Sequence, residues 1–164
     1  KVLKLDRVIW VPARTPPHKK QASAVSAQDR AALVEAALQG HPGFSISRVE
    51  LERPGPSYSI DTVLQLQAEQ PGGEWFFLIG SDAAAALSTW KEIEQLRERV
   101  EFVVVPRPGG ARAGSLPQGI RVIEVETKPI SASQVRRRIQ AGESIRGWVS
   151  EGVRKLIERK GLYK

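Results

Sequence analysis

The sequence of 164 residues contains no cysteine, no methionine and only two histidines, His18 and His41. Without cysteine the chain can form neither a disulfide framework nor a thiolate metal site, and two histidines disfavour a histidine-based metal cage. No apolar run reaches the roughly 18 residues that a membrane-spanning helix requires, and no signal-peptide pattern opens the chain. We therefore expect a soluble, cytoplasmic protein that does not bind a membrane.

The sequence also lacks an initiator methionine, because its first residue is Lys1. We therefore expect residues upstream of Lys1 in the natural protein. The residues present are enough for one core, and a hydrophobic fraction of 41% is ordinary for a globular protein. Because no repeat, low-complexity tract or linker divides the chain, residues 1–164 are predicted to form a single domain.

Charge is distributed unevenly along the chain. Residues 1–127 contain 15 Lys and Arg and 15 Asp and Glu, whereas residues 128–164 contain 10 basic residues and only three acidic ones. The whole net charge of +7 therefore lies in the C-terminal part. Such a basic segment could bind a nucleic acid or, equally well, a polyanionic small ligand. The position of the segment in the fold is needed to distinguish the two.

Short apolar runs alternate with helical patterns. Strands are predicted at Arg7–Val11, from Phe44–Ile46 towards Leu51, and at Trp75–Ile79, Val100–Val105 and Ile120–Val125. Helices are predicted to begin at Ser26, near Ile60, at Ser88, at Ser131 and at about Ser150, with Gly40, Gly142 and Gly161 ending three of them. This alternation predicts a three-layer α/β/α, Rossmann-like fold with a parallel sheet between helices.

Ligands of such folds bind beyond the carboxyl ends of the strands. Four loops follow predicted strands, beginning at Pro12, Gly80, Pro106 and Lys128. Because the carboxyl ends of parallel strands meet at one edge of a sheet, these loops are expected to lie together. That edge is the predicted functional site.

The segment Ile130–Arg138 (ISASQVRRR) opens a predicted helix directly after a strand. A helix N-terminus offers unpaired backbone N–H groups and partial positive charge, which attract phosphate. Ser131 and Ser133 add hydroxyl groups, and Arg136 and Arg137 add positive charge one turn further on. By residue type alone a capped surface helix is an equally good interpretation, but the position after a strand favours a polyphosphate site.

Other candidate residues follow the remaining strands. In Gly80-Ser81-Asp82 the glycine would admit a ligand close to the backbone and Asp82 could accept hydrogen bonds from ribose hydroxyls, unless Asp82 is only a helix N-cap. Trp90 could stack on a flat cationic ring, or it could be a core residue. Two prolines precede His18 and Lys19, and a stiff backbone lowers the entropy cost of holding an anion.

Six motifs occur in an order characteristic of one family. They are PPHK at Pro16–Lys19, SYSIDT at Ser57–Thr62, IGSD at Ile79–Asp82 with Thr89-Trp90, VPRPG at Val105–Gly109, ISASQVR at Ile130–Arg136 and GLYK at Gly161–Lys164. On these motifs the chain resembles the bacterial nicotinate-nucleotide adenylyltransferases of the nucleotidyltransferase superfamily, over essentially its whole length. The ISASQVR pattern is shared across the superfamily, whereas PPHK, SYS and Thr-Trp narrow the resemblance to this family.

The resemblance implies an enzyme of NAD biosynthesis that transfers an adenylyl group from ATP to nicotinate mononucleotide, giving the dinucleotide and pyrophosphate. It also implies Mg²⁺ as the cofactor, bridging the phosphates of ATP. The residues implied on the ATP side are Gly80, Asp82, Ser131, Ser133 and Arg136. On the pyridine side the resemblance implies stacking by Trp90, supported by Ser59 and Lys19.

The sequence departs from the family in two places. Lys91 stands where the family often has Tyr, which argues against a two-aromatic sandwich around the pyridine. The family's GxFDPxHxGH segment, with a strand, a helix and two histidines that contact the ATP phosphates, is absent. We therefore assign no catalytic residue, and we expect the 164-residue chain alone to be inactive; an intact mass matching 164 residues would contradict an upstream continuation.

Three other functions remain as alternatives. A phosphopantetheine adenylyltransferase would lack Trp90 and the PPHK loop, and a non-catalytic nucleotide sensor can be separated only by assay. A basic nucleic-acid-binding module suits the charge of residues 128–164, but the sequence has no strand platform of basic and aromatic residues, so no nucleic-acid partner is expected. The sequence is compatible with a homo-oligomer and does not distinguish nicotinate from nicotinamide.

Overall fold

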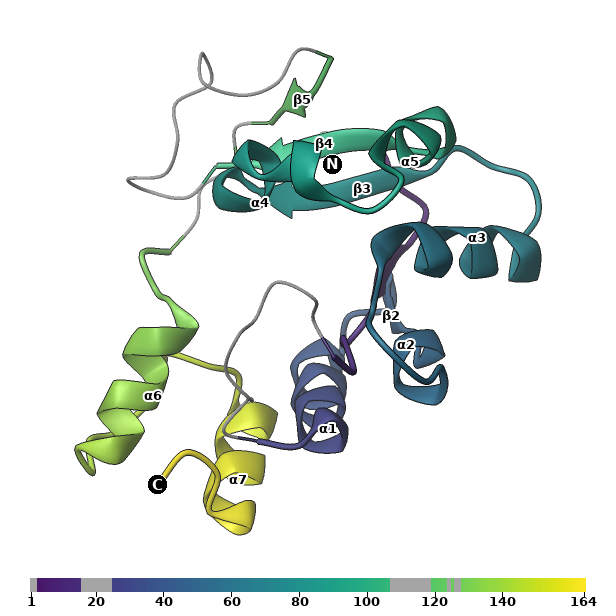
Figure 1. Cartoon of the computed structure of the whole chain (residues 1–164). Helices are drawn as coiled ribbons and strands as arrows, with labels where there is room; N and C mark the ends of the chain where they lie inside the picture. The colour runs from purple at the N-terminus through teal and green to yellow at the C-terminus, as the bar shows by residue number, and fades with distance from the viewer. Residues whose placement is uncertain (1–2, 16–24, 107–118, 124, 126–127) are drawn as a thin grey trace. The chain divides into compact units, whose positions relative to one another are not determined.

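The computed structural model describes the chain from Leu3 to Lys164 except residues 16–24, 107–118, 124 and 126–127. It has two compact units, one formed by Leu3–Ser57 with Ile130–Lys164 and the other by Tyr58–Pro129 (Figure 1). The described strands pair in parallel in both units, with helices between them along the chain. The predicted parallel α/β arrangement is therefore confirmed, whereas the single domain stays a prediction.

The first unit contains a parallel strand pair joined by a helix. β1 (Val8–Trp10) pairs with β2 (Phe44–Ile46), and α1 (Ala27–Leu38) connects them. The N–H of Asp29 donates to the side chain of Ser26, so α1 begins at the predicted cap. Gly40, in the left-handed region at φ 81°, follows its end as predicted.

The chain after β2 differs from its prediction. Instead of continuing as a strand towards Leu51, it forms the short helix α2 (Val49–Glu52). Val49, Glu50 and Leu51 are all buried, although successive residues of a strand point to opposite faces of the sheet. The N–H groups of Glu52 and Arg53 donate to the carbonyl oxygens of Arg48 and Val49, so this segment forms a helical turn that the sequence pattern did not reveal.

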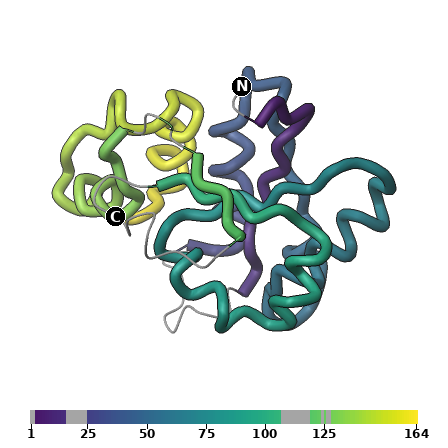
Figure 2. The backbone as a smooth tube through the Cα atoms, turned by 90° about the horizontal axis from the view of Figure 1, so that it is seen from above, coloured from purple at the N-terminus to yellow at the C-terminus, as the bar shows by residue number. Residues whose placement is uncertain are grey.

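The C-terminal helices complete the first unit. α6 (Ala132–Gln140) and α7 (Glu151–Lys160) are the green-to-yellow segments of Figure 1, and Figure 2 traces the same chain in a second view. Val135, Ile145 and Ile157 form their common core, against which Leu33 of α1 packs. Both helices have the serine caps predicted for them.

The second unit contains a parallel sheet in the order β3 (Phe76–Gly80), β4 (Glu101–Val105) and β5 (Arg121–Val122). β5 is shorter than predicted for Ile120–Val125, because among the described residues only two of its positions pair with β4. α3 (Ser59–Glu69) and α4 (Ser81–Ala85) pack against this sheet through a shared core that includes Ile60, Ile79 and Ala84.

A single helix was expected from Ser88 through Leu96, but the chain is interrupted there. A 3₁₀ helix, η1 (Leu87–Thr89), is followed by α5 (Ile93–Arg99). Between them Glu92 adopts the left-handed conformation at φ 51°, which is uncommon for a residue other than glycine. Trp90 therefore lies in a turn and not at the start of a helix. No helix among the described residues is long and apolar enough to cross a bilayer.

Candidate functional site

Two of the four loops expected at the site begin at the same edge of a sheet. In the parallel pairing of β3 with β4, Gly80 lies opposite Val105, so Pro106 and Ser81 both follow strand ends at that edge. The loop at Pro12 belongs to the first unit and Lys128 to the second. That these two loops join the same edge stays a prediction.

Gly80 and Asp82 occupy the turn from β3 into α4. Gly80 is the N-cap of this helix, so the N-cap role considered for Asp82 is wrong, and Asp82 lies exposed in the first turn. The φ of Gly80 is −82°, which any residue can adopt, so its backbone conformation does not require glycine. Between them Ser81 is 1% exposed, and its hydroxyl has no hydrogen-bond partner among the described residues.

Trp90 has the core contacts considered for it, whereas its stacking on a ligand ring stays a prediction. Its ring packs edge-to-face on Phe77 and Phe102, with centroid separations of 5.6 and 6.3 Å, so part of it belongs to the core of the second unit. The same residue lines an open hollow of about 530 Å³ together with Glu92–Gln95. Trp90 is thus an anchored aromatic residue beside an accessible space.

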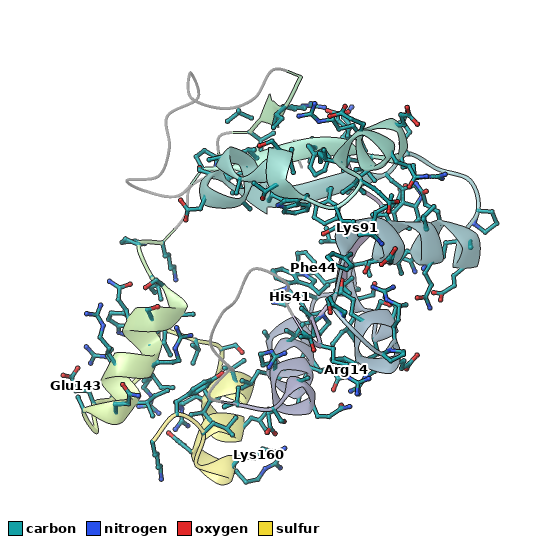
Figure 3. All side chains as sticks on the ribbon, viewed as in Figure 1. Arg14, His41, Phe44, Lys91, Glu143 and Lys160 are labelled. Atoms are coloured by element: carbon teal, nitrogen blue, oxygen red, sulfur yellow. The ribbon has the colours of Figure 1, made fainter. Side chains whose placement is uncertain are left out.

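Ser59 is the first residue of α3, and Lys91 links this helix to the turn of Trp90 (Figure 3). The Lys91 ammonium lies 3.6 Å from Oδ1 of Asp61 and 4.9 Å from the ring centroid of Tyr58, the N-cap of α3. From the sequence, Lys91 was of interest only because it stands where the family often has Tyr. The structure shows that it connects the two segments that carry Ser59 and Trp90.

The N-terminus of α6 has the predicted capping box. The N–H of Gln134 donates to Oγ of Ser131 at 3.2 Å, and the N–H of Ser131 donates to Oε1 of Gln134 at 2.7 Å. Arg136 donates from Nη2 to Oγ of Ser133 at 3.0 Å. Among the described residues no group accepts from the N–H groups of Ala132 and Ser133. This exposed first turn therefore retains two backbone donors and two hydroxyl groups beside a guanidinium group.

The third arginine of α6 is engaged elsewhere. Arg138 pairs with Glu143 at 2.8 Å, donates to the carbonyl of Ser144 and lies 4.7 Å from the ring centroid of Trp148. For Arg136 and Arg137 the structure records no ion pair within the described ranges. Free positive charge on α6 is therefore concentrated on these two residues.

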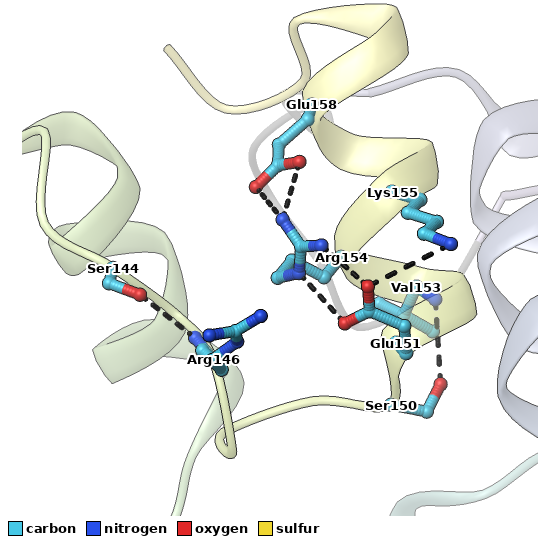
Figure 4. Close-up of polar contacts among 8 residues, drawn as sticks. All are labelled: Ser144, Arg146, Ser150, Glu151, Val153, Arg154, Lys155 and Glu158. Carbon is cyan, nitrogen blue, oxygen red and sulfur yellow. Dashed lines mark hydrogen bonds and ion pairs between the residues drawn. The ribbon is translucent and has the colours of Figure 1, made fainter.

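Ion pairs also neutralise part of the basic charge of α7 (Figure 4). Arg154 lies between Glu151 and Glu158, at 2.6 and 2.5 Å. The hydrogen bond from Arg154 lowers the pKa of Glu151 below its ordinary value, and burial opposes this only in part. Lys160 bonds Asp29 of α1 at 2.5 Å, and this bond is the main cause of the lowered pKa of Asp29.

The predicted site residues thus fall into three groups. Gly80, Asp82, Ser59 and Trp90 belong to the second unit, Ser131, Ser133 and Arg136 belong to the first, and Lys19 lies outside the described residues. Within the described part of the chain no group of three His, Asp or Glu side chains could hold a metal ion. A larger hollow of about 710 Å³ lies at the amino ends of β3 and β4, and Gly80, Asp82, Ser59 and Trp90 do not line it.

Known proteins are similar to this chain over nearly its whole length. The cytidylyltransferase-like family matches residues 1–138. The chain is 45% identical to the "probable nicotinate-nucleotide adenylyltransferase" of Geobacillus thermodenitrificans, over 98% of this chain and 74% of that one. It is 40% identical to the protein of the same description from Thermus thermophilus, over 99% of this chain and 86% of that one.

A solved structure has a similar fold. Plasmodium falciparum nicotinic acid mononucleotide adenylyltransferase, complexed with NaAD, matches with a TM-score of 0.73 at 16% identity, over 97% of this chain and 83% of that one. The chain belongs to the cytidylyltransferase-like nucleotidyltransferases and, among them, to the nicotinate-nucleotide adenylyltransferases, which are transferases. The family inferred from the six motifs and the nucleotidyltransferase fold are both confirmed.

Proposed function

We propose that this protein transfers an adenylyl group from ATP to nicotinate mononucleotide in the cytoplasm, releasing pyrophosphate and forming the dinucleotide. The observation that carries the proposal is the first turn of α6, where two N–H groups without an acceptor in the described part of the chain, two serine hydroxyls and Arg136 lie together. Such a turn suits a polyphosphate, because backbone donors, the helix dipole and a guanidinium group all favour negative charge.

On the ATP side we assign the phosphates to Ser131, Ser133 and Arg136, and the adenosine to Gly80 and Asp82. Ser131 already accepts the Gln134 N–H through its oxygen, and its hydroxyl hydrogen remains available to a phosphate oxygen. The same holds for Ser133, whose oxygen accepts from Arg136. Each serine oxygen already accepts one hydrogen bond within α6, so each hydroxyl group can donate its hydrogen to a phosphate oxygen.

On the mononucleotide side we assign Trp90 to the pyridine ring, supported by Ser59 and Lys19. The ring of a pyridine nucleotide carries positive charge, so it gains from contact with an aromatic face. The packing of Trp90 on Phe77 and Phe102 fixes its orientation beside the hollow before a ligand arrives. A fixed ring loses little conformational entropy on binding.

The chemistry requires positioning and charge neutralisation more than proton transfer. The attacking group is a phosphate oxygen of the mononucleotide that is already ionised at neutral pH, so no general base is needed. It bonds to the α-phosphorus of ATP as the bond to pyrophosphate breaks, and the donors of α6 would hold the phosphate oxygens in place during this exchange.

We assign Mg²⁺ to the ATP phosphates and not to a protein cage. Mg²⁺ is commonly held by one or two carboxylates together with substrate phosphates, and the described residues contain no cluster of three ligands. Asp82, exposed at the strand edge, is the one carboxylate among the assigned residues. When bound, the ion would neutralise charge on the phosphates.

A pyrophosphate-release assay on the full-length protein tests the proposal. ATP is supplied with nicotinate mononucleotide, nicotinamide mononucleotide or phosphopantetheine as the acceptor, and we expect turnover with the first. Release with phosphopantetheine alone would support the neighbouring adenylyltransferase, and binding without release would support a nucleotide sensor. A shift of labelled RNA or DNA at physiological salt, without turnover, would favour the nucleic-acid-binding alternative.

A further inference from the structure

Lys91 lies in a turn of the second unit whose backbone conformation is unusual. Glu92, directly after it, adopts the left-handed conformation at φ 51°, which is uncommon for a residue other than glycine. Trp90, directly before it, donates its N–H to the carbonyl oxygen of Leu87 at 3.0 Å. Residues in such conformations persist only where the surrounding structure enforces them, and they cluster at binding and catalytic sites. The turn is therefore a candidate for a binding role beyond that of Trp90.

The side chain of Lys91 extends from this turn to the start of α3 (Figure 3). Its Nζ lies 3.6 Å from Oδ1 of Asp61, 3.5 Å from Oε1 of Glu92 and 4.9 Å from the ring centroid of Tyr58. The side chain is nevertheless 41% exposed. The ammonium group is thus paired within the protein and also accessible to a ligand.

The position of this ammonium group bears on one feature of the mononucleotide. Nicotinate and nicotinamide mononucleotides differ only in the substituent of the pyridine ring, which is a carboxylate in the first and a neutral amide in the second. Lys91 follows Trp90 in the chain, and Tyr58 precedes Ser59, so Lys91 joins the two segments of the second unit to which we assign the ring. A cation at this place attracts a carboxylate more strongly than an amide.

The neighbours of Lys91 strengthen this discrimination. Asp61 and Glu92 place two carboxylates around a single ammonium group. Without the ammonium group, these two negative charges would repel a ligand carboxylate and would affect a neutral amide much less. Ion pairs between partly exposed groups are weak, so a ligand carboxylate can compete with Asp61 and Glu92 for Lys91.

We infer that Lys91 is a specificity residue, which favours nicotinate over nicotinamide mononucleotide by pairing with the carboxylate of the pyridine ring. The inference rests on the proposed function, because it takes the ring to lie on Trp90. Lys91 stands where the family often has Tyr, and a tyrosine hydroxyl group, which is neutral at pH 7, would not supply this charge.

Four variants of the full-length protein test the inference. Lys91→Met removes the charge and keeps most of the length of the side chain, whereas Lys91→Arg keeps the charge. A double variant, Lys91→Met with Asp61→Asn, also removes one of the two neighbouring carboxylates. Lys155→Met is the matched control, because Lys155 is an exposed lysine of the first unit that pairs with Glu151 at 3.9 Å. Calorimetric titration measures the affinities for both mononucleotides and for ATP.

We expect Lys91→Met to weaken the binding of nicotinate mononucleotide by about fivefold, and to change the affinities for nicotinamide mononucleotide and ATP less than about twofold. Lys91→Arg and Lys155→Met should keep the ratio of the two mononucleotide affinities within about twofold of the wild type. The double variant should recover part of the lost affinity, because it removes a repulsion that Lys91→Met leaves uncompensated. Equal losses for both mononucleotides in Lys91→Met, or no recovery in the double variant, would overturn the specificity role.

The two proposals fail in different ways. If the full-length wild type binds neither mononucleotide and releases no pyrophosphate, the proposed function is wrong and the inference falls with it. If the wild type releases pyrophosphate with nicotinate mononucleotide, and Lys91→Met keeps the wild-type ratio of mononucleotide affinities, the inference alone is wrong. Should Lys91→Met not fold, the neutral and polar variant Lys91→Gln takes its place in both comparisons.

Discussion

Replacing Trp90 by alanine should produce two separable losses. The packing loss comes from two edge-to-face pairs, with Phe77 and Phe102, each worth about 0.5–1.5 kcal/mol beyond the area they bury. Because Trp90 is only partly buried, we expect the free energy of unfolding to fall by about 2–3 kcal/mol, below the 3–5 kcal/mol typical of a core tryptophan. This loss affects the whole second unit.

The binding loss should concern one substrate. Contact between a cationic ring and an aromatic face is worth about 1–2 kcal/mol, which corresponds to about a 5- to 30-fold weaker affinity for nicotinate mononucleotide. ATP should bind nearly as before. Calorimetric titration of each ligand, well below the unfolding temperature of the variant, measures both affinities.

Phe77→Leu is the matched control for this experiment. It disturbs the packing of Trp90 but changes no residue that lines the hollow. We expect it to lower stability, to leave ATP affinity within about twofold of the wild type, and to weaken mononucleotide binding less than Trp90→Ala does, because the ring is loosened but not removed. Equal losses for ATP and mononucleotide in Trp90→Ala, or an equal loss of mononucleotide binding in Phe77→Leu, would refute the assigned role of the ring.

Three further predictions concern single groups. Arg136→Ala should weaken ATP binding by about 1.5–3 kcal/mol and spare the mononucleotide, as measured by the same titrations. Ser81→Ala should raise the free energy of unfolding by about 1 kcal/mol, because it removes a buried hydroxyl that has no partner among the described residues; a decrease in denaturant unfolding would reveal a bond. Lys160→Met should raise the pKa of Asp29 towards its ordinary value, as followed by NMR titration. Because the folded pKa of Asp29 is lowered, its contribution to stability is present above the unfolded pKa and is lost as the pH falls through the folded pKa, so the stability difference between the variant and the wild type should shrink in acid.

The features of the fold that depend on local chemistry could be predicted from the sequence. The caps at Ser26, Ser131 and Ser150 lie where they were expected, because a cap is decided by residues within one turn. The helix α2 and the interruption after η1 could not be predicted in this way. Both depend on which side chains the rest of the unit buries, and Glu92 in particular adopts a conformation that its residue type does not favour.

Contacts between residues far apart in the sequence could not be predicted for a related reason. Arg30 lies on the first turn of α1, and its acceptors include a backbone carbonyl 17 positions away. Carbonyl acceptors leave no trace in a sequence pattern, because every residue has one. The contacts of Lys91 could not be predicted either, since its partners are Asp61 of α3 and Tyr58, the N-cap of that helix. Motifs indicated the groups that are proposed to touch a ligand, whereas bonds between residues far apart in the sequence are seen only in the structure.

The three successive arginines of α6 show why net charge alone was a poor guide to the ligand. Consecutive helical residues point about 100° apart, so Arg136, Arg137 and Arg138 cannot share one face. Arg138 is held by Glu143 and Trp148, while Arg136 bonds Ser133 in the first turn. On α7, Arg154 pairs with Glu151 and Glu158, and Lys160 pairs with Asp29 of α1. A nucleic acid needs many cations along its phosphates, whereas a triphosphate needs few at one point, and the distribution of unpaired charge on α6 favours the triphosphate.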